Sequence, residues 1–392
     1  MGYSISDLTK MAEECTCGLN HFEINIEEIT IKKHALQDAV NYLQKKSYQN
    51  VMIVVDDTTY EAAGKQLCEQ LTVTNIYHQL CYITPDKNND VVADEVSLVQ
   101  VLLETPNDVD VILAVGSGTI HDIVRFVSYK MGKPFISIAT APSVDGFNSM
   151  GAPLVIKGMK QTFQLHSPIA VFGDLSILQD APKKMIAAGF GDMIGKYTSL
   201  TDWKFGHLTA NEPYCPLVAK VTEEALISCA ENVDRIADGD EEGIRILFDA
   251  LVQSGLAMLL MGQSHPASGG EHHLSHYWEM EFLKAEVPQI LHGAKVGVTC
   301  QLISETYKGR FKEGLQNGAY SDLDPFKEEL IELINSIPEP AHIKKMIEDI
   351  GGDATPESLG VSQQLIDRSV AEAHNLRNRY TILRYLNEHT IK

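Results

Sequence analysis

The chain has 392 residues, of which 44% are hydrophobic, enough to bury a large core and to form two domains. Its formal net charge is −21, from 53 acidic and 32 basic residues, and such a surface repels nucleic acid and anionic membranes. No apolar run approaches the ~20 residues that span a bilayer. We therefore expect a cytoplasmic protein that binds a small molecule rather than nucleic acid or a membrane.

The seven cysteines show neither a zinc-finger spacing nor the framework of a small disulfide-rich domain. Cys15 and Cys17 are two positions apart and are able to bind a metal together, but no second pair stands near them in the sequence. The sequence therefore favours reduced thiols without a metal.

The first half of the chain alternates apolar runs with amphipathic stretches. Residues 24–49 combine a short strand at Ile24 and Ile26 with a helical stretch. Further strands are predicted at residues 51–57, 76–84, 109–115, 134–139 and 167–172. Helices are predicted between them at residues 60–71, 94–104 and 118–129. This alternation predicts an α/β domain with a parallel sheet.

A small-residue turn, Gly116-Ser117-Gly118, stands between a predicted strand and a predicted helix. Glycines let the backbone approach a pyrophosphate, and the N–H groups of the new helix face its negative charge. His121 stands where the standard dinucleotide fingerprint has its third glycine. The turn is therefore either a phosphate cradle or a plain strand-to-helix connection.

Polar residues also follow the other predicted strands. Asp56 ends the strand at residues 51–57, and hydroxyls and Asp145 follow the strand at residues 134–139. Side chains at the carboxyl ends of parallel strands suit a ribose, a nicotinamide or a polyol, although ordinary turns contain the same residue types.

From Pro182 onward helical periodicity dominates, so we place a domain boundary near residue 178. Residues 1–178 are predicted to form an α/β dinucleotide-binding domain, and residues 179–392 a helical domain for metal and substrate. Within the second, Asp192 lies among apolar residues and glycines, where a carboxylate needs a partner.

A histidine-rich helix follows the loop at residues 264–268. Ser268 and Glu271 have the spacing of a capping box, which predicts a helix start at Gly269. His272 and His276 are four apart and share a face, whereas His273 points elsewhere. Two imidazoles on one face suit a metal, but such a pair also occurs on solvated helix faces.

Five motifs occur in an order that resembles the superfamily of iron-containing alcohol dehydrogenases, glycerol dehydrogenases and dehydroquinate synthases. They are Gly116-Ser117-Gly118, the segment 140–146, Ala188-Gly189-Phe190-Gly191-Asp192, Ser268-Gly269-Gly270-Glu271-His272 and His292-Gly293. Within the superfamily the chain looks most like the sn-glycerol-1-phosphate dehydrogenases, in particular their bacterial AraM-type branch. The resemblance implies an N-terminal nucleotide domain and a helical metal domain.

The resemblance also implies a role for individual residues. The implied metal ligands are Asp192, His272 and His292. The implied cofactor contacts are Asp56, Gly116, Ser117, Gly118, Thr119, Ile120, Thr140, Ser143 and Ser149. The residues implied at the substrate, with catalytic roles, are Asp145, Asp192 and His276. Lys196 and Arg379 are candidates to contact a substrate phosphate.

By the resemblance, the protein is expected to reduce dihydroxyacetone phosphate to sn-glycerol 1-phosphate, reversibly, with NADH or NADPH and one divalent metal, nickel or zinc. Asp56 favours NADH, because a carboxylate repels a 2′-phosphate. A homodimer is expected. The alternatives are a glycerol dehydrogenase for unphosphorylated polyols, a cyclase like dehydroquinate synthase, and a metal-binding scaffold without activity.

Overall fold

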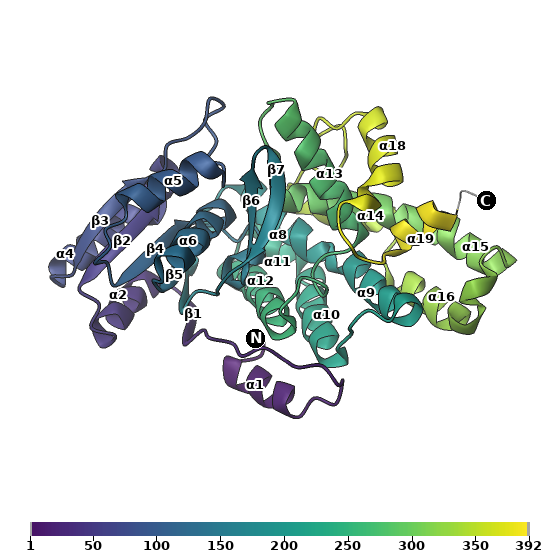
Figure 1. Cartoon of the computed structure of the whole chain (residues 1–392), viewed down its shortest axis with the longest axis horizontal. Helices are drawn as coiled ribbons and strands as arrows, with labels where there is room; N and C mark the ends of the chain where they lie inside the picture. The colour runs from purple at the N-terminus through teal and green to yellow at the C-terminus, as the bar shows by residue number, and fades with distance from the viewer. Residues whose placement is uncertain (1, 390–392) are drawn as a thin grey trace.

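The computed structural model describes residues 2–389. A parallel sheet with its helices forms one end of an elongated molecule, and a large group of helices forms the other (Figure 1). A two-stranded hairpin, β6–β7, lies between the two ends (Figure 1). The predicted order, an α/β part followed by a helical part, is confirmed.

The six-stranded sheet has the order β1-β8-β5-β4-β2-β3, and all neighbouring strands are parallel. Its strands are β1 (Glu28–Lys32), β2 (Asn50–Val55), β3 (Tyr77–Tyr82), β4 (Val111–Gly116), β5 (Phe135–Ala139) and β8 (Ala170–Asp174). The predicted boundary near residue 178 falls in α7 (Leu175–Gln179), directly after β8. This boundary stays a prediction.

Both faces of the sheet are buried. Val51 and Val55 on β2 pack in one apolar cluster with α2 (Ala35–Lys45) and α4 (Lys65–Val73). Met52 and Val54 point the other way, into a cluster that includes residues of α5 (Glu95–Glu104) and α6 (Gly118–Met131). Because successive side chains on a strand point to opposite faces, a continuous apolar run is what a strand covered on both sides requires.

The expected strand at Ile24 and Ile26 is wrong. The first strand, β1, begins at Glu28, which pairs with Ala170 of β8. Ile24 and Ile26 are buried in the apolar core of the helical half instead. Their alternation therefore reflects burial of an extended segment against helices and not pairing within the sheet.

The hairpin of β6 (Gly151–Ile156) and β7 (Met159–Gln164) was not predicted. Its two connecting residues, Lys157 and Gly158, have φ angles of 53° and 73°. A two-residue turn with positive φ at both positions matches the twist of an antiparallel pair, and glycine is favoured in it. The signal was therefore present in the sequence at Lys157-Gly158.

The rest of the chain is helical, apart from loops and short 3₁₀ and π segments. Its helices after α7 are α8 (Lys183–Ile194), α9 (Lys196–Ala210), α10 (Pro216–Ala230), α11 (Val233–Asp238), α12 (Glu241–Met261), α13 (Gly270–Lys284), α14 (His292–Thr306), α15 (Lys312–Asn317), α16 (Lys327–Ser336), α17 (Pro340–Asp349), α18 (Gln363–Glu372) and α19 (Ile382–His389). Among the described residues, α12 alone is long and apolar enough to cross a membrane, and 78% of that stretch is buried inside the protein. A core helix of a folded domain meets the same criteria.

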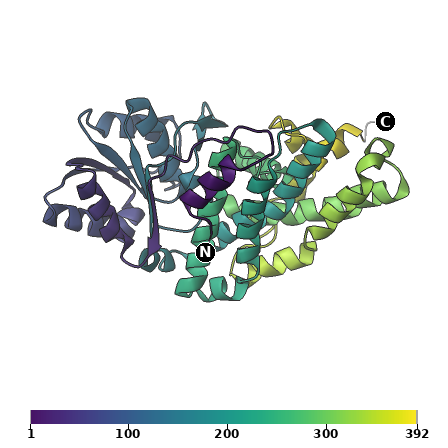
Figure 2. The same ribbon diagram turned by 90° about the horizontal axis from the view of Figure 1, so that it is seen from below.

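The N-terminal segment, residues 2–22, lies against helices of the second half of the chain (Figure 2). It contains α1 (Ile5–Glu13), and we call it the N-terminal arm. The Gly2 N–H donates to Asp249 of α12 at 2.7 Å, and the Tyr3 hydroxyl donates to Glu224 of α10 at 2.7 Å. The arm therefore ties the start of the chain to the helices of its second half.

Glycines let α8 and α14 come into backbone contact. A Cβ atom on Gly293 would lie 1.8 Å from the carbonyl oxygen of Ala188, and one on Gly191 would lie 2.3 Å from the carbonyl oxygen of Gly293. Since each glycine is next to a predicted metal ligand, Asp192 or His292, this contact sets the distance between those two side chains.

We expect Gly293→Ala to lower the free energy of unfolding by about 1–3 kcal/mol, the usual cost of overpacking a close contact. Chemical denaturation measures the change. Gly309→Ala is the matched control, because a Cβ atom there meets nothing within 4 Å. Equal stability of the two variants would contradict the role of the α8–α14 contact.

Candidate metal and nucleotide site

A cavity of about 360 Å³ lies where the hairpin, the carboxyl ends of the sheet strands and the helical half meet. Its lining includes these predicted site residues: Ser117, Gly118, Thr119, Ser143, Asp145, Ser149, His272, His276 and His292. The predicted site residues outside the lining are Asp56, Gly116, Ile120, Thr140 and Asp192. The fold thus collects most of the predicted site from segments far apart in the sequence.

The N-terminus of α6 opens into this cavity. Ser117 is its N-cap residue, and no side chain caps the helix there. The first N–H groups of a helix have no partner within the helix, and together with the helix dipole they form a site for an anion. Gly118 is constrained as well, because a Cβ atom would lie 2.9 Å from a methyl of Val144.

Gly116 and His121 contribute to the packing of α6 against the sheet. A Cβ atom on Gly116 would lie 2.5 Å from the Ile120 side chain, which covers it. His121 is buried between the Ser117 carbonyl oxygen at 2.8 Å and the Ser137 hydroxyl at 2.7 Å. Burial lowers the pKa of His121 to about 3, so that its ring is neutral. His121 therefore joins α6 to the sheet, which is the task of the third glycine in the standard fingerprint.

Asp56 and Thr140 have local hydrogen bonds at strand ends. The Asp56 carboxylate accepts from the Thr59 N–H at 2.7 Å and caps the short helix α3 (Asp57–Thr59). The Thr140 N–H donates to the Gly116 carbonyl at 3.0 Å and continues the pairing of β4 with β5. Both residues therefore end their strands on the carboxyl edge of the sheet.

Asp192, His272 and His292 converge from α8, α13 and α14. Asp192 Oδ1 lies 3.7 Å from His272 Nε2 and 3.9 Å from His292 Nε2. The three potential ligand atoms lie within 4.8 Å of one another. Burial lowers the pKa of His292 well below its usual value, so its ring is neutral, as a metal ligand must be.

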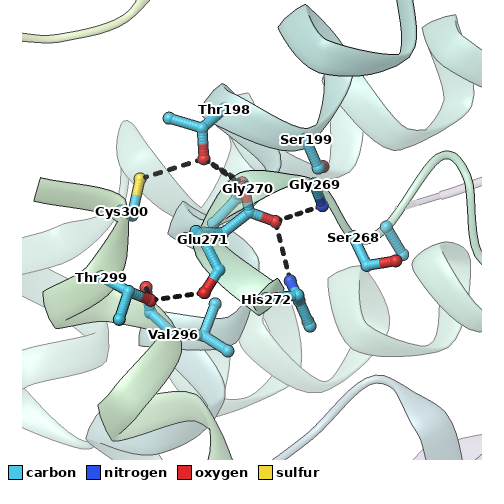
Figure 3. A network of polar contacts seen from close by, with 12 residues as sticks. Thr198, Ser199, Ser268, Gly269, Gly270, Glu271, His272, Val296, Thr299 and Cys300 are labelled. Carbon is cyan, nitrogen blue, oxygen red and sulfur yellow. Dashed lines mark hydrogen bonds and ion pairs between the residues drawn. The ribbon is translucent and has the colours of Figure 1, made fainter. Parts of the chain in front are cut away.

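Glu271 orients the His272 ring (Figure 3). Its carboxylate accepts from His272 Nδ1 at 2.7 Å, from the Gly269 N–H at 2.6 Å and from the Thr198 hydroxyl at 2.6 Å. Burial acts to raise the pKa of Glu271, but these donors hold it at about 2. The proton on Nδ1 leaves the lone pair of Nε2 free to face Asp192, a common support for a metal-binding histidine.

The predicted capping box at this helix is wrong. The Ser268 hydroxyl donates to the Ser264 carbonyl, and Gly269 is an N-cap residue without a side-chain bond. Buried carboxylates take the place of the serine: Glu271 accepts from the Gly269 N–H, and Asp202 accepts from the Gly270 N–H at 2.7 Å. The helix begins at Gly270, one residue later than predicted.

The positive charge of Lys196 compensates the negative charges of the buried carboxylates at the potential metal site. Its ammonium lies 2.7 Å from Asp145 Oδ2 and 3.4 Å from Asp192 Oδ1. Burial opposes its charge, but the two carboxylates raise the pKa of Lys196 above its usual value. The Asp145 N–H donates to Asp192 Oδ2 at 2.9 Å, which leaves Oδ1 directed at the imidazoles.

Neither cation predicted to contact a phosphate lines the cavity. Lys196 is fully buried against Asp145 and Asp192. Arg379 donates to the Ser268 carbonyl at 2.9 Å and lies 3.7 Å from Glu212. Both are occupied by internal partners.

Three other cations line the cavity, and we call Lys160, Lys295 and Arg377 the cation cluster. Glu279 accepts from Lys160 at 2.8 Å and lies 3.1 Å from Lys295. Burial lowers the pKa of Lys295 to about 8 and that of Arg377 to about 10. At neutral pH three positive charges thus face one carboxylate, so the cluster carries an excess of about two positive charges.

His276 lies between this cluster and the metal ligands. Its Nε2 accepts from Arg377 at 2.9 Å, and its ring centre lies 5.7 Å from that of His292. Burial and the charge of Arg377 lower the pKa of His276 well below its usual value. With Nε2 as acceptor, the proton of the neutral ring is on Nδ1, which lies 3.7 Å from Glu279 Oε2, beyond hydrogen-bond distance.

Sequence reasoning missed the cation cluster and Glu279. Two local signals were available: Glu279 is three residues after His276, and Lys295 is three after His292, spacings that share a helix face. Lys160 and Arg377 have no comparable signal, because the fold brings them from the hairpin and from the segment before α19.

Comparison with known proteins identifies the family of the chain. The family of iron-containing alcohol dehydrogenases matches residues 30–182. The glycerol-1-phosphate dehydrogenase (NAD(P)+) of Geobacillus stearothermophilus is 52% identical over 99% of both chains, and that of Geobacillus thermodenitrificans is 50% identical over 99% of this chain and 98% of the relative.

A solved structure, glycerol dehydrogenase from Schizosaccharomyces pombe, matches with a TM-score of 0.66 at 15% identity and covers 93% of this chain and 90% of that one. At this identity the likeness shows the fold alone. The full-length relatives are what decide the family: the chain belongs to the glycerol-1-phosphate dehydrogenases, within the iron-containing alcohol dehydrogenases.

Proposed function

We propose that the protein reduces dihydroxyacetone phosphate to sn-glycerol 1-phosphate, reversibly, with NADH or NADPH and a divalent metal. The names of the full-length relatives support the reaction. The observation that carries the proposal is one cavity shared by an open helix N-terminus, two imidazoles of a potential metal site and the cation cluster. These features suit a dinucleotide, a ketone and a phosphate, respectively.

Asp192, His272 and His292 are the proposed metal ligands. One carboxylate oxygen and two imidazoles suit a divalent transition metal and leave coordination positions open for substrate. Both Nε2 atoms lie within 4 Å of Asp192 Oδ1, which is also 3.4 Å from the Lys196 ammonium, and the Asp145 N–H occupies Oδ2. When bound, the ion supplies Lewis acidity at the ketone oxygen. Nickel and zinc are the proposed candidates.

We propose that the N-terminus of α6, at Ser117 to Ile120, holds the cofactor pyrophosphate. Ser143 and Ser149, which line the same cavity, are proposed to contact the cofactor, with Thr140 supporting their loop. Asp56, on the carboxyl edge of the sheet, is proposed to favour NADH over NADPH by repelling a 2′-phosphate. A lower kcat/KM for NADH than for NADPH would contradict that preference.

His276 is proposed to act on the substrate oxygen. Its Nδ1 is buried 3.7 Å from Glu279 Oε2 and makes no close hydrogen bond, so it is able to donate to a ligand in the cavity. Arg377 holds the other nitrogen, so that rotation of the ring is restrained. The bound cofactor would supply hydride to the carbonyl carbon, and His276 would donate a hydrogen bond or a proton at the oxygen. Asp145, held by Lys196 and Ser254, is proposed to border the substrate.

The cation cluster is proposed to bind the substrate phosphate. Its excess of about two positive charges matches a phosphate dianion, whose second pKa is about 6. The protein as a whole is strongly acidic, so this attraction has to be local. A glycerol dehydrogenase acting on unphosphorylated polyols remains the alternative. The cluster favours the phosphorylated substrate, since buried cations without an anionic ligand are costly.

We further propose that the enzyme works in the cytoplasm as a homodimer. In addition to the family resemblance, Val96, Val99 and Leu103 form an exposed apolar row on one face of α5, a surface suited to a second copy. A mass of one chain in sedimentation equilibrium would contradict the dimer.

The direct test is oxidation of NADH by metal-stripped protein to which nickel, zinc or iron is returned, with dihydroxyacetone phosphate and dihydroxyacetone compared. We expect metal-dependent turnover that strongly prefers the phosphorylated ketone. Turnover of the unphosphorylated ketone alone would point to a glycerol dehydrogenase. Nucleotide binding without turnover would revive the scaffold or cyclase alternatives.

Glu271→Gln is expected to weaken binding of the metal at His272 by about 10- to 100-fold, because the charged acceptor that orients the ring is lost. Calorimetric titration with nickel measures the change. Glu281→Gln, on the same helix but paired with Lys284 and Arg368, is the control and should bind normally. Unchanged affinity in Glu271→Gln would remove Glu271 from the metal site.

Lys160→Gln is expected to raise KM for dihydroxyacetone phosphate about 10- to 100-fold, since a hydrogen bond to a charged group contributes about 1.5–3 kcal/mol. Turnover of dihydroxyacetone, which lacks the phosphate, should change little. Lys157→Gln, exposed on the turn of the same hairpin, is the control. Equal effects on both ketones would place the phosphate elsewhere.

A further inference from the structure

Four metal-binding side chains meet outside the cavity, at the junction of the N-terminal arm and α10. Cys15, Cys17 and His21 come from the arm, and Cys215 is the residue that precedes α10. Their potential ligand atoms all lie within 4.8 Å of one another. The missing partner of the Cys15–Cys17 pair is therefore supplied by a residue two hundred positions away.

The distances within this group match the edges of a zinc tetrahedron. Bond lengths of about 2.3 Å to sulfur and about 2.0–2.1 Å to nitrogen place two sulfurs about 3.8 Å apart and a sulfur and a nitrogen about 3.6 Å apart. Cys15 and Cys215 have their sulfurs 3.7 Å apart, and His21 Nε2 lies 3.5 Å from Cys17 Sγ and 3.7 Å from Cys215 Sγ. The sulfurs of Cys15 and Cys215 are far beyond the ~2.05 Å of a disulfide.

Local structure directs these side chains inward. Gly18 has a φ of 80°, which lets the chain reverse after Cys17 and brings His21 back to it. Cys215 is the N-cap residue of the fifteen-residue helix α10, and no side chain caps that helix. The positive end of a helix dipole stabilises a thiolate, the form in which cysteine binds metal.

We propose that Cys15, Cys17, His21 and Cys215 form a structural zinc site that fastens the N-terminal arm to the helical half. Three thiols lose their protons on binding, and the imidazole binds through Nε2 as the neutral ring. Four protein ligands close the coordination sphere, so the site holds no substrate. Soft thiolates select zinc over the magnesium or calcium that oxygen ligands prefer.

The arm has few other anchors. Leu8 is its one fully buried apolar residue, and its remaining anchors are hydrogen bonds and partly buried contacts. A metal that binds the native state and not the unfolded chain stabilises the contacts that build its site. The zinc would thus hold residues 2–22 in place on α10 and α12.

Cobalt substitution tests the site directly. Cobalt bound by thiolates gives sulfur-to-metal charge-transfer absorption, which a site of one aspartate and two histidines does not give. We expect this absorption in the reduced full-length protein, and we expect elemental analysis of the zinc-loaded protein to find two equivalents per chain. Absence of the absorption would overturn the proposal.

Variants distinguish the proposed zinc site from the site of Asp192, His272 and His292. Cys17→Ser should lose the charge-transfer band and one zinc equivalent, and limited proteolysis should then cut the arm faster. His272→Ala should keep the band, because its change lies in the other cluster. Cys68→Ser, the same substitution at a half-buried cysteine outside the group, is the matched control and should keep both metals. An unchanged band in Cys17→Ser would contradict the assignment.

Discussion

The buried carboxylate of Asp192 is the constraint on which the site depends. Its side chain has no solvent exposure, and an ionised carboxylate in such a place is stable only when charges and donors compensate it. The Asp145 N–H donates to Oδ2, while Lys196 and the two imidazoles approach Oδ1. Backbone contact between α8 and α14 makes this arrangement possible. The charged groups of the site therefore depend on the glycines that allow the two helices to come together.

A strongly acidic protein reaches a local excess of positive charge by bringing three cations from separate segments around one carboxylate, Glu279. The hairpin supplies Lys160, α14 supplies Lys295, and the segment before α19 supplies Arg377. Because these groups share a cavity with the N-terminus of α6, two anionic groups of different molecules can be held on either side of the imidazoles. The local positive field is therefore a property of the assembled cavity and not of the whole chain.

The two ligand clusters differ in the number and type of their protein ligands, which is what distinguishes open from closed metal sites. Asp192, His272 and His292 offer hard and borderline donors at a cavity wall and leave positions for substrate, whereas three cysteines and His21 complete a tetrahedron without it. We propose that the first cluster supports chemistry and that the second holds the arm to the helices. Both join segments that are distant along the chain.

The sequence by itself determined the sheet and the helical second half, because runs such as residues 51–55 are apolar on both faces and periodicity changes after Pro182. Motif resemblance also singled out Asp192, His272 and His292. Only the tertiary structure decided the cation cluster, the position of the N-terminal arm and the meeting of Cys15 and Cys17 with Cys215. Local patterns report which side of an element is apolar, but they do not report which distant element packs against it.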